Sequence, residues 1–184
     1  MKLVILDRDG VINEDSDEYI KSDEEWIPIP GSIKAIRDLS NNGFTVVIAT
    51  NQSGIARQLF DEYALAKIHH KMCSLVEESG GVIDGVFFCP HAPDANCNCR
   101  KPKTGLLTAI SEEFGVPLNQ APLIGDSLKD IEAARAALCR PILVKTGKGS
   151  ETLAGLNEDQ LKNLTVVPDL KHAVSIILES HSSC

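Results

Sequence analysis

Short apolar runs alternate along the chain with segments whose apolar residues recur at helical spacing. The first run, Leu-Val-Ile-Leu at residues 3–6, stops at the polar sequence Asp7-Arg8-Asp9-Gly10. A run of branched residues bounded by a turn signal predicts a buried strand. Further strands are expected at residues 44–49, 82–88, 122–124 and 141–144, with a short sixth strand at 166–167.

Between these strands, apolar residues recur every three or four positions, which predicts helices that each bury one face. Asp61 is the expected N-cap of a helix that continues to Ser79, and Asp169 that of the last helix. The other expected helices cover residues 32–42, 104–114 and 131–138. Repeated strand–helix units favour an α/β architecture with a mostly parallel sheet and helices on both faces.

Length and composition limit the classes of protein that fit this pattern. The 184 residues fit a single domain, residues 1–184, because single helices fill most gaps between strands. With a net charge of −8 and no basic stripe, the chain is a poor match for nucleic acid. Its apolar runs fall far short of the ~20 residues that span a membrane, and no secretion signal precedes the first strand. We expect a cytoplasmic monomer.

Candidate chemistry begins where the first strand ends. Asp7 and Asp9 lie two positions apart, so both carboxylates face the same side of the chain. In an open parallel sheet this end of a strand faces the ligand crevice. Two neighbouring negative charges are costly there unless a cation offsets them, and Asp oxygens suit Mg²⁺. The pair predicts one nucleophile and one general acid/base, whereas the alternative is a strand end with solvated acids.

Two further strand ends carry polar residues. Thr50 and the turn at 51–54 offer a hydroxyl and backbone N–H groups that suit phosphate oxygens, although an ordinary polar turn has the same composition. Asp126 follows the fourth strand as another candidate ligand for a hard cation, and Asp130, one helical turn later, could orient it. The alternative for this stretch is a helix N-cap.

The segment between the third strand and the next helix carries two candidate sites. The sequence Arg100-Lys101-Pro102-Lys103 concentrates three positive charges in an acidic chain, which suits a phosphoryl group or, alternatively, a solvated loop. Just before it lie three thiols and one imidazole that form a tetrahedral donor set for structural Zn²⁺. These four candidate zinc ligands are Cys89, His91, Cys97 and Cys99.

The other three cysteines have no such neighbours. Cys73 lies in a helical pattern and Cys139 at a helix end, so both are expected to be small buried residues. Cys184 lies in a polar tail that we expect to fray.

With these pieces in order, the sequence resembles the haloacid dehalogenase (HAD) superfamily of phosphohydrolases. The resemblance runs from Leu3 to about Thr146. It rests on the order of four motifs followed by one acidic residue: Asp7-x-Asp9-Gly10, Thr50, Lys101, Gly125-Asp126 and Asp130. Together with the Cys/His loop, this order resembles the subfamily that includes histidinol-phosphate phosphatases. The resemblance implies a Rossmann-like, three-layer HAD fold with a zinc-stapled loop and no cap domain.

The resemblance also implies a role for each motif residue. Asp7 would attack phosphorus and carry an aspartyl-phosphate, while Asp9 would protonate the leaving oxygen and then activate water. Mg²⁺ would be held by Asp7, the backbone carbonyl of Asp9 and Asp126. Thr50 and Lys101 would hold the transferred phosphoryl group.

Substrate contacts are implied for a second set of residues, namely Asn51, Gln52, Ser53, Arg100, Asp15 and Tyr19. Arg100 and Lys148 could bind a second phosphate, which favours a small anionic sugar bisphosphate as substrate. Histidinol phosphate is the alternative, because the acidic residues at 14–18 could receive its cationic amine. A different class of protein, a zinc-stabilised binding module without catalysis, would show no turnover at all.

Overall fold

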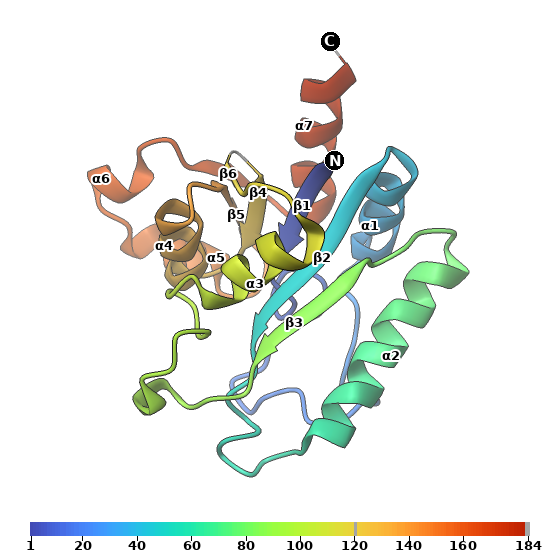
Figure 1. Ribbon diagram of the computed structural model, residues 1–184, viewed down its shortest axis with the longest axis vertical. Coiled ribbons are helices and arrows are strands. Elements are labelled where there is room, and N and C mark those ends of the chain that lie inside the picture. The colour runs from blue at the N-terminus through green and yellow to red at the C-terminus, as the bar shows by residue number, and fades with distance from the viewer. Residues whose placement is uncertain (120, 183–184) are drawn as a thin grey trace.

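In the computed structural model, which describes residues 1–119 and 121–182, six parallel strands form one sheet (Figure 1). Their order across the sheet is β3-β2-β1-β4-β5-β6. The chain therefore starts at β1 in the centre and adds β2 and β3 on one side. It then crosses over to β4 on the other side of β1 and continues outward to β5 and β6. The strands are β1 (Lys2–Leu6), β2 (Phe44–Asn51), β3 (Gly85–Cys89), β4 (Pro122–Gly125), β5 (Arg140–Val144) and β6 (Thr165–Val167).

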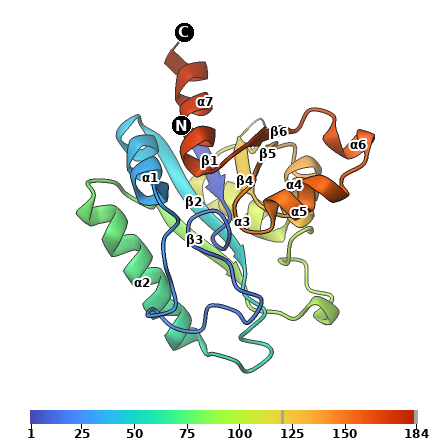
Figure 2. The same cartoon turned by 180° about the vertical axis from the view of Figure 1, so that it is seen from behind.

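Helices cover both faces of the sheet, as the two opposite views show (Figures 1 and 2). The helices are α1 (Ser32–Asn41), α2 (Glu62–Glu78), α3 (Gly105–Phe114), α4 (Leu128–Ala136), α5 (Gly149–Gly155), α6 (Glu158–Leu161) and α7 (Leu170–Ser182). Val4 and Leu6 of β1 pack with residues of α1, α2 and α7, whereas Leu3 and Ile5 pack with α3 and α4. A strand buried on both faces is continuously apolar, which explains the run at residues 3–6. The predicted α/β fold with a parallel sheet is confirmed.

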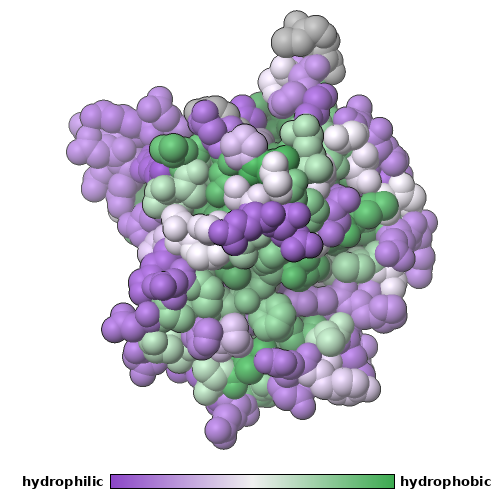
Figure 3. Space-filling model, in the orientation of Figure 1, coloured by the Kyte–Doolittle hydropathy of each residue, from purple (hydrophilic) through white to green (hydrophobic). Residues whose placement is uncertain are grey.

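The edge strand β3 is less buried than the central strands, since its first four residues are only partly covered. The face seen in Figure 3 accordingly shows hydrophobic residues in patches among hydrophilic ones. Within the described part of the chain, no helix is both long and apolar enough to cross a membrane.

Two long connections lie at the carboxyl edge of the sheet. The first, residues 7–31, contains isolated bridges only, and it buries Trp26 completely. Lys71 of α2 anchors it, because its Nζ donates to the carbonyls of Asp23 at 2.6 Å and Trp26 at 2.9 Å. The second, residues 90–104, contains a single 3₁₀ turn, Pro93–Ala95. Among the described residues, neither connection forms a separate folded cap over the edge.

Several element boundaries differ from the sequence-based expectation. The third strand begins at Gly85 rather than at Val82, which is 49% exposed. Asp84 ends the preceding turn, because its backbone N–H donates to the Val46 carbonyl and its carboxylate accepts from the Val46 N–H, each at 2.8 Å. These two bonds satisfy the backbone of Val46, near the start of β2, before regular pairing with β3 begins at Val47.

The predicted helix at 131–138 starts earlier, at Leu128, since Ser127 and Asp130 form a reciprocal capping box. Helices α5 and α6 were not predicted. They are short, and α6 is stabilised by its own capping box between Asn157 and Gln160. The Asp61 cap is as predicted, and the carboxylate of Asp169 accepts from the N–H of His172 at 3.0 Å.

The cysteines outside the Cys/His loop follow their expected burial only in part. Cys139 is buried and Cys73 is partly exposed. The prediction for Cys184 lies outside the described residues.

Candidate active site

The carboxylates predicted from separate motifs meet where the direction of the sheet connections reverses. Asp7 directly follows β1, and its N–H donates to the carbonyl of Ile124 in the neighbouring strand β4 at 2.8 Å. Asp126 directly follows β4. The crevice between two such strands is the usual ligand site of an open α/β sheet. A cleft of about 260 Å³ opens here, lined by six aspartates and four cationic side chains.

Lys101 connects three elements beneath this cleft. Its side chain is 2% exposed, and its Nζ lies 2.6 Å from Asp130 Oδ1, 3.0 Å from Asp7 Oδ1 and 2.7 Å from the Ala49 carbonyl. Burial alone lowers the pKa of Lys101, but the charges of Asp130 and Asp7 raise it above its ordinary value. The ammonium group is therefore permanently charged and stands directly beside Asp7.

The pKa values of Asp7 and Asp126 are both raised, because the positive charge around these carboxylates does not offset their burial. Burial raises the pKa of Asp7 to about 7 against the opposing effect of Lys101. Burial, together with the charges of Asp7 and Asp130, raises the pKa of Asp126 to about 8. Carboxylate oxygens of all three lie within 4.8 Å of one another. Because Lys101 and Ser127 already contact both Asp130 oxygens, Asp7 and Asp126 are the carboxylates available to a cation.

Two glycines fix the position of the Asp126 carboxylate. A Cβ added to Gly10 would lie 2.0 Å from Asp126 Oδ2, and one added to Gly147 would lie 2.3 Å from the same atom. Both glycines have positive φ angles, 77° and 55°, which other residues rarely adopt. The N–H of Lys148 donates to Asp126 Oδ2 at 2.8 Å, and Thr152 Oγ1 donates to its carbonyl at 2.9 Å. The donor set and its rigid support fit Mg²⁺.

Asp9 has the opposite electrostatic environment to Asp7. Burial raises the pKa of Asp9, but the Arg8 guanidinium and hydrogen bonds from Asn13, Arg8 and Gln52 outweigh it, so the pKa lies below its usual range. Gln52 Nε2 donates to Asp9 Oδ2 at 2.9 Å and to Thr50 Oγ1 at 2.9 Å. Two neighbouring carboxylates with diverging pKa values are the usual arrangement for separate chemical roles.

Some of the predicted substrate residues lie inside the cleft, and the others lie at its mouth. Gln52 and Ser53 are 3% and 7% exposed, and Gln52 supports Asp9 and Thr50 from inside the cleft. Asn51 ties the end of β2 to Lys101, accepting from its N–H at 3.0 Å and donating to its carbonyl at 3.1 Å. Both amide side chains therefore organise the residues around them.

The remaining predicted contacts line the mouth of the same cleft. Asp15, Tyr19, Arg100 and Lys148 all lie there. Lys148 Nζ is 3.1 Å from Asp17 Oδ1 and 3.6 Å from Asp15 Oδ2, which joins the two sides of the mouth. Arg100 Nη1 donates to the His91 carbonyl at 3.3 Å, so it borders both the cleft and the Cys/His loop.

Several residues of the site escaped the sequence reasoning. Lys129 lines the cleft, and Asn13 donates from Nδ2 to Asp9 Oδ1 at 2.9 Å. Arg8 and His69 lie behind Asp9, where Arg8 is fully buried. For Arg8 the sequence did offer a signal, because this cation lies between two aspartates at the end of a buried strand. His69 gave none, because it is one of two adjacent histidines on a helix.

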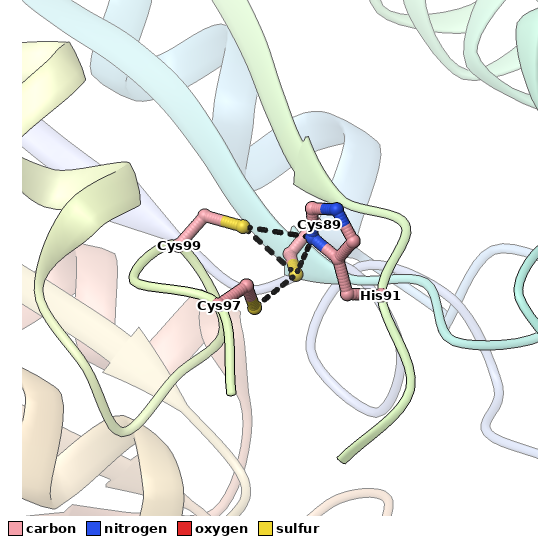
Figure 4. Close-up of side chains that lie close together, drawn as sticks. All are labelled: Cys89, His91, Cys97 and Cys99. Atoms are coloured by element: carbon pink, nitrogen blue, oxygen red, sulfur yellow. Dashed lines mark hydrogen bonds between the residues drawn. The ribbon is translucent and has the colours of Figure 1, made fainter. Parts of the chain in front are cut away.

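The four candidate zinc ligands gather in one cluster (Figure 4). The Cys89 Sγ atom lies 3.5 Å from His91 Nδ1, 3.7 Å from Cys97 Sγ and 3.1 Å from Cys99 Sγ. His91 Nδ1 is 3.2 Å from Cys99 Sγ. Donors about 3–4 Å apart form a tetrahedron of the size that Zn–S bonds of about 2.3 Å require. The set therefore fits one Zn²⁺ with no open coordination position.

Comparison with known proteins identifies the class that this fold and site define. The model of the HAD-hydrolase-like family matches residues 98–173, and that of the polynucleotide kinase 3 phosphatase family matches residues 2–135. The chain is a phosphatase of the HAD-like class, as the motif order predicted.

Curated relatives and solved structures define the family within this class. A D-glycero-beta-D-manno-heptose-1,7-bisphosphate 7-phosphatase of Pseudomonas aeruginosa is 57% identical over 82% of this chain and 85% of its own length. The relative of the same name from Bordetella bronchiseptica is 53% identical over 84% and 86%. The chain belongs to the family of D-glycero-beta-D-manno-heptose-1,7-bisphosphate 7-phosphatases.

Two solved structures support this assignment. The D,D-heptose 1,7-bisphosphate phosphatase from B. bronchiseptica, complexed with magnesium and phosphate, matches with a TM-score of 0.93 and 49% identity. That match covers 98% of this chain and 99% of the other. The corresponding enzyme from Burkholderia thailandensis matches with a TM-score of 0.75 and 42% identity, over 97% and 99%.

Proposed function

We propose that this protein removes the 7-phosphate of D-glycero-D-manno-heptose 1,7-bisphosphate through an aspartyl-phosphate on Asp7. The observation that carries the proposal is the position of Asp7, whose Oδ1 lies 3.0 Å from Lys101 Nζ in the crevice between β1 and β4. A carboxylate is a competent nucleophile toward phosphorus when fixed cations neutralise the phosphoryl oxygens.

The first step joins Asp7 to the phosphoryl group. An Asp7 oxygen forms a bond to phosphorus while the bond from phosphorus to the sugar oxygen breaks. Lys101 and the hydroxyl of Thr50 stabilise the charge on the phosphoryl oxygens, and Asp9 delivers a proton to the departing sugar oxygen. Because the pKa of Asp9 is low in the free protein, this proton arrives with the substrate, since a phosphomonoester loses its second proton near pH 6.

The second step returns Asp7 to its free form. Asp9 accepts a proton from a water molecule, whose oxygen attacks phosphorus as the bond from phosphorus to the Asp7 oxygen breaks, and inorganic phosphate is released. Asp7, Asp126 and the Asp9 carbonyl would hold Mg²⁺, which when bound neutralises negative charge on the phosphoryl oxygens. Because six aspartates and four cationic side chains line the cleft, such a cation would offset its excess negative charge toward an anionic substrate.

The distal part of the substrate meets the mouth of the cleft. Arg100 lies there next to the catalytic Lys101, and we assign it to the second phosphate of the bisphosphate, with Lys148 as its partner. The acidic residues Asp15 and Asp17 favour a second candidate substrate, histidinol phosphate, whose amine is cationic. Lys148 already balances both acids in this structure, which favours the bisphosphate.

We further propose that Cys89, His91, Cys97 and Cys99 hold a structural Zn²⁺ that fixes the loop beside Arg100.

Residues 1–184 would act as one domain and as a monomer in the cytoplasm. The product would feed the nucleotide-activated heptose used for lipopolysaccharide core, and neither nucleic acid nor membrane would be a partner.

Phosphate release in the presence of Mg²⁺ tests the proposal. Purified protein is assayed side by side with heptose 1,7-bisphosphate and histidinol phosphate, and the position of the remaining phosphate is determined. We expect a strong preference for the bisphosphate with the 1-phosphate left intact. Arg100→Ala should weaken this turnover about tenfold, the cost of about 1.4 kcal/mol of lost binding, and spare a small generic ester. Equal losses on both substrates would refute the role of Arg100, and preference for histidinol phosphate would move the assignment to that substrate.

A further inference from the structure

Arg8 carries a fully buried charge directly behind the active site. It stands between the two catalytic aspartates in the sequence, but its side chain is 0% exposed. Its Nε lies 3.1 Å from Asp9 Oδ1, and its Nη2 lies 2.9 Å from Oδ1 and 3.1 Å from Oδ2. A buried charge is stable only when its partner and its geometry are both good. The forked guanidinium of Arg8 meets this condition by contacting both oxygens of Asp9.

Helix α2 supports Arg8 from the other side. The Nη1 atom of Arg8 lies 3.3 Å from Nε2 of His69. Because a guanidinium only donates, Nε2 must accept, which places the ring proton of a neutral His69 on Nδ1. Burial and the charge of Arg8 lower the pKa of His69 to about 4, in agreement with a neutral ring. The neighbouring Ile68 belongs to the main core, so His69 stands on a rigid support.

This arrangement gives the two carboxylate oxygens of Asp9 different numbers of hydrogen bonds. Oδ1 accepts from Arg8 Nε, from Arg8 Nη2 and from Asn13 Nδ2. Among the described residues, Oδ2 accepts the longer Arg8 contact and the Gln52 amide, one hydrogen bond fewer than Oδ1, so it keeps more capacity for a further bond. The side chain of Asp9 is 23% exposed and lines the cleft, so its carboxylate is accessible to a bound ligand.

We propose that Arg8 and His69 are positioning residues that hold the Asp9 carboxylate so that Oδ2 is the oxygen that transfers the proton. The proposal rests on the function proposed above. Oδ2 gives its proton to the sugar oxygen as the bond from phosphorus to that oxygen breaks, and it takes a proton from water in the second step. His69 thereby links helix α2 to the chemical step without touching substrate.

Leaving-group dependence separates this role from a purely structural one. An alkyl oxygen leaves only with a proton, whereas p-nitrophenolate leaves without one. A misplaced Asp9 should therefore slow phosphorylation of Asp7 by a sugar phosphate and spare phosphorylation by p-nitrophenyl phosphate. A general structural defect would slow both reactions together. Positioned proton transfer contributes about 10²–10⁴-fold to a rate, which sets the upper limit of the effect.

The experiment compares four variants in single-turnover measurements with saturating Mg²⁺. Arg8→Lys keeps the charge but loses the fork, and His69→Leu removes the acceptor. His69→Gln places a carbonyl oxygen near the position of Nε2, and His70→Leu is the matched control, because His70 is the exposed neighbour on the same helix. Phosphorylation of Asp7 is timed by rapid quench with heptose 1,7-bisphosphate and by the nitrophenol burst with p-nitrophenyl phosphate.

We expect Arg8→Lys to slow phosphorylation by the sugar phosphate about 100-fold and His69→Leu about tenfold, both below the upper limit of about 10⁴-fold for general acid catalysis. The nitrophenol burst rate should stay within about threefold for both, His69→Gln should restore the sugar phosphate rate, and His70→Leu should match the wild type. Equal slowing with both leaving groups, or no rescue by His69→Gln, would overturn the proposal. If the wild type itself forms no phosphoenzyme, the proposed function fails instead.

Discussion

The carboxylate site and the Cys/His loop are both clusters of cation-binding side chains, but they are held in place in different ways. Asp7 and Asp126 follow adjacent central strands, and Lys101 and Asp130 between them are 2% and 1% exposed. In the Cys/His loop, the 3₁₀ turn Pro93–Ala95 contains no buried residue. Sheet and core therefore fix the carboxylates before a cation binds, whereas the loop depends on its ligand cluster.

This difference has a functional consequence at the junction of the two regions. Lys101 follows the loop by two residues, yet its ammonium group is held by Asp130 and the Ala49 carbonyl, and its backbone by Asn51. The Arg100 side chain donates to the His91 carbonyl, which belongs to the loop itself. Loss of the zinc cluster should thus disturb the substrate contact of Arg100 more than the catalytic position of Lys101.

The substitution Asp7→Asn should separate the carboxylate site from the Cys/His loop most clearly. The variant lacks the nucleophile, so we expect turnover of the bisphosphate to fall on the order of 10⁴-fold. Zinc content and the circular dichroism spectrum should stay unchanged, because Lys101 keeps Asp130 as a buried partner. Steady-state phosphate release and metal analysis check both parts, and a near-normal rate would refute the assignment of Asp7.

A smaller loss is expected from Lys101→Met, with Lys103→Met as its control two residues away. Removing the buried ammonium should lower kcat about 10²–10³-fold, as for other fixed groups that stabilise developing charge. The Nζ of Lys103 donates to the carbonyls of Asn96 and Cys97, and the residue is exposed, so its variant should keep kcat within about twofold. Both are assayed well below their melting temperatures. Similar losses in the two variants would show that the positive charge of this segment acts only in bulk.

Cys97→Ser should separate stability from chemistry. We expect loss of bound zinc and a melting temperature lower by about 4–8 °C, equivalent to about 2 kcal/mol in a chain of this length. The kcat should fall less than about tenfold, since Lys101 keeps its own contacts. Cys73→Ser, on α2 and away from the cluster, should keep its zinc. Wild-type protein that purifies without zinc would remove the basis of this comparison.

The carboxylate site should also give a pH-dependent response of stability to Mg²⁺. The pKa values of Asp7 and Asp126 are about 7 and about 8 in the folded protein, against 3.8 in the unfolded chain. The metal-free folded state therefore binds more protons, and these two groups lower its stability as pH rises from about 4 to 8. Mg²⁺ should raise the melting temperature by several degrees at pH 8, equivalent to about 2.7 kcal/mol at a hundredfold excess over Kd.

At pH 5 the same addition should have little effect, because protons occupy the two carboxylates. Thermal melts with and without Mg²⁺ at both pH values measure the difference. Asp126→Asn should abolish the response at pH 8 while leaving the zinc-dependent part of the stability intact. A response of equal size at both pH values would show that Mg²⁺ stabilises the protein elsewhere.

Much of this architecture follows from local sequence patterns. The apolar run at 3–6 requires a strand buried on both faces, and the Asp61 and Asp169 caps start helices as expected. Cys89, His91, Cys97 and Cys99 could be grouped because they lie within eleven residues. Boundaries differ from the expected ones where local hydrogen bonds compete, as at Asp84 before β3 and at Ser127 before α4.

By itself, the sequence determined which side chains stand at the carboxyl ends of the strands, because period and turn residues act over a few positions. The tertiary structure alone decided that Lys101 meets Asp130, 29 residues away, and that His69 reaches Arg8, 61 residues away. Those contacts depend on strand order and on the directions of long side chains. Both result from packing the whole chain around one sheet, so no local pattern encodes them.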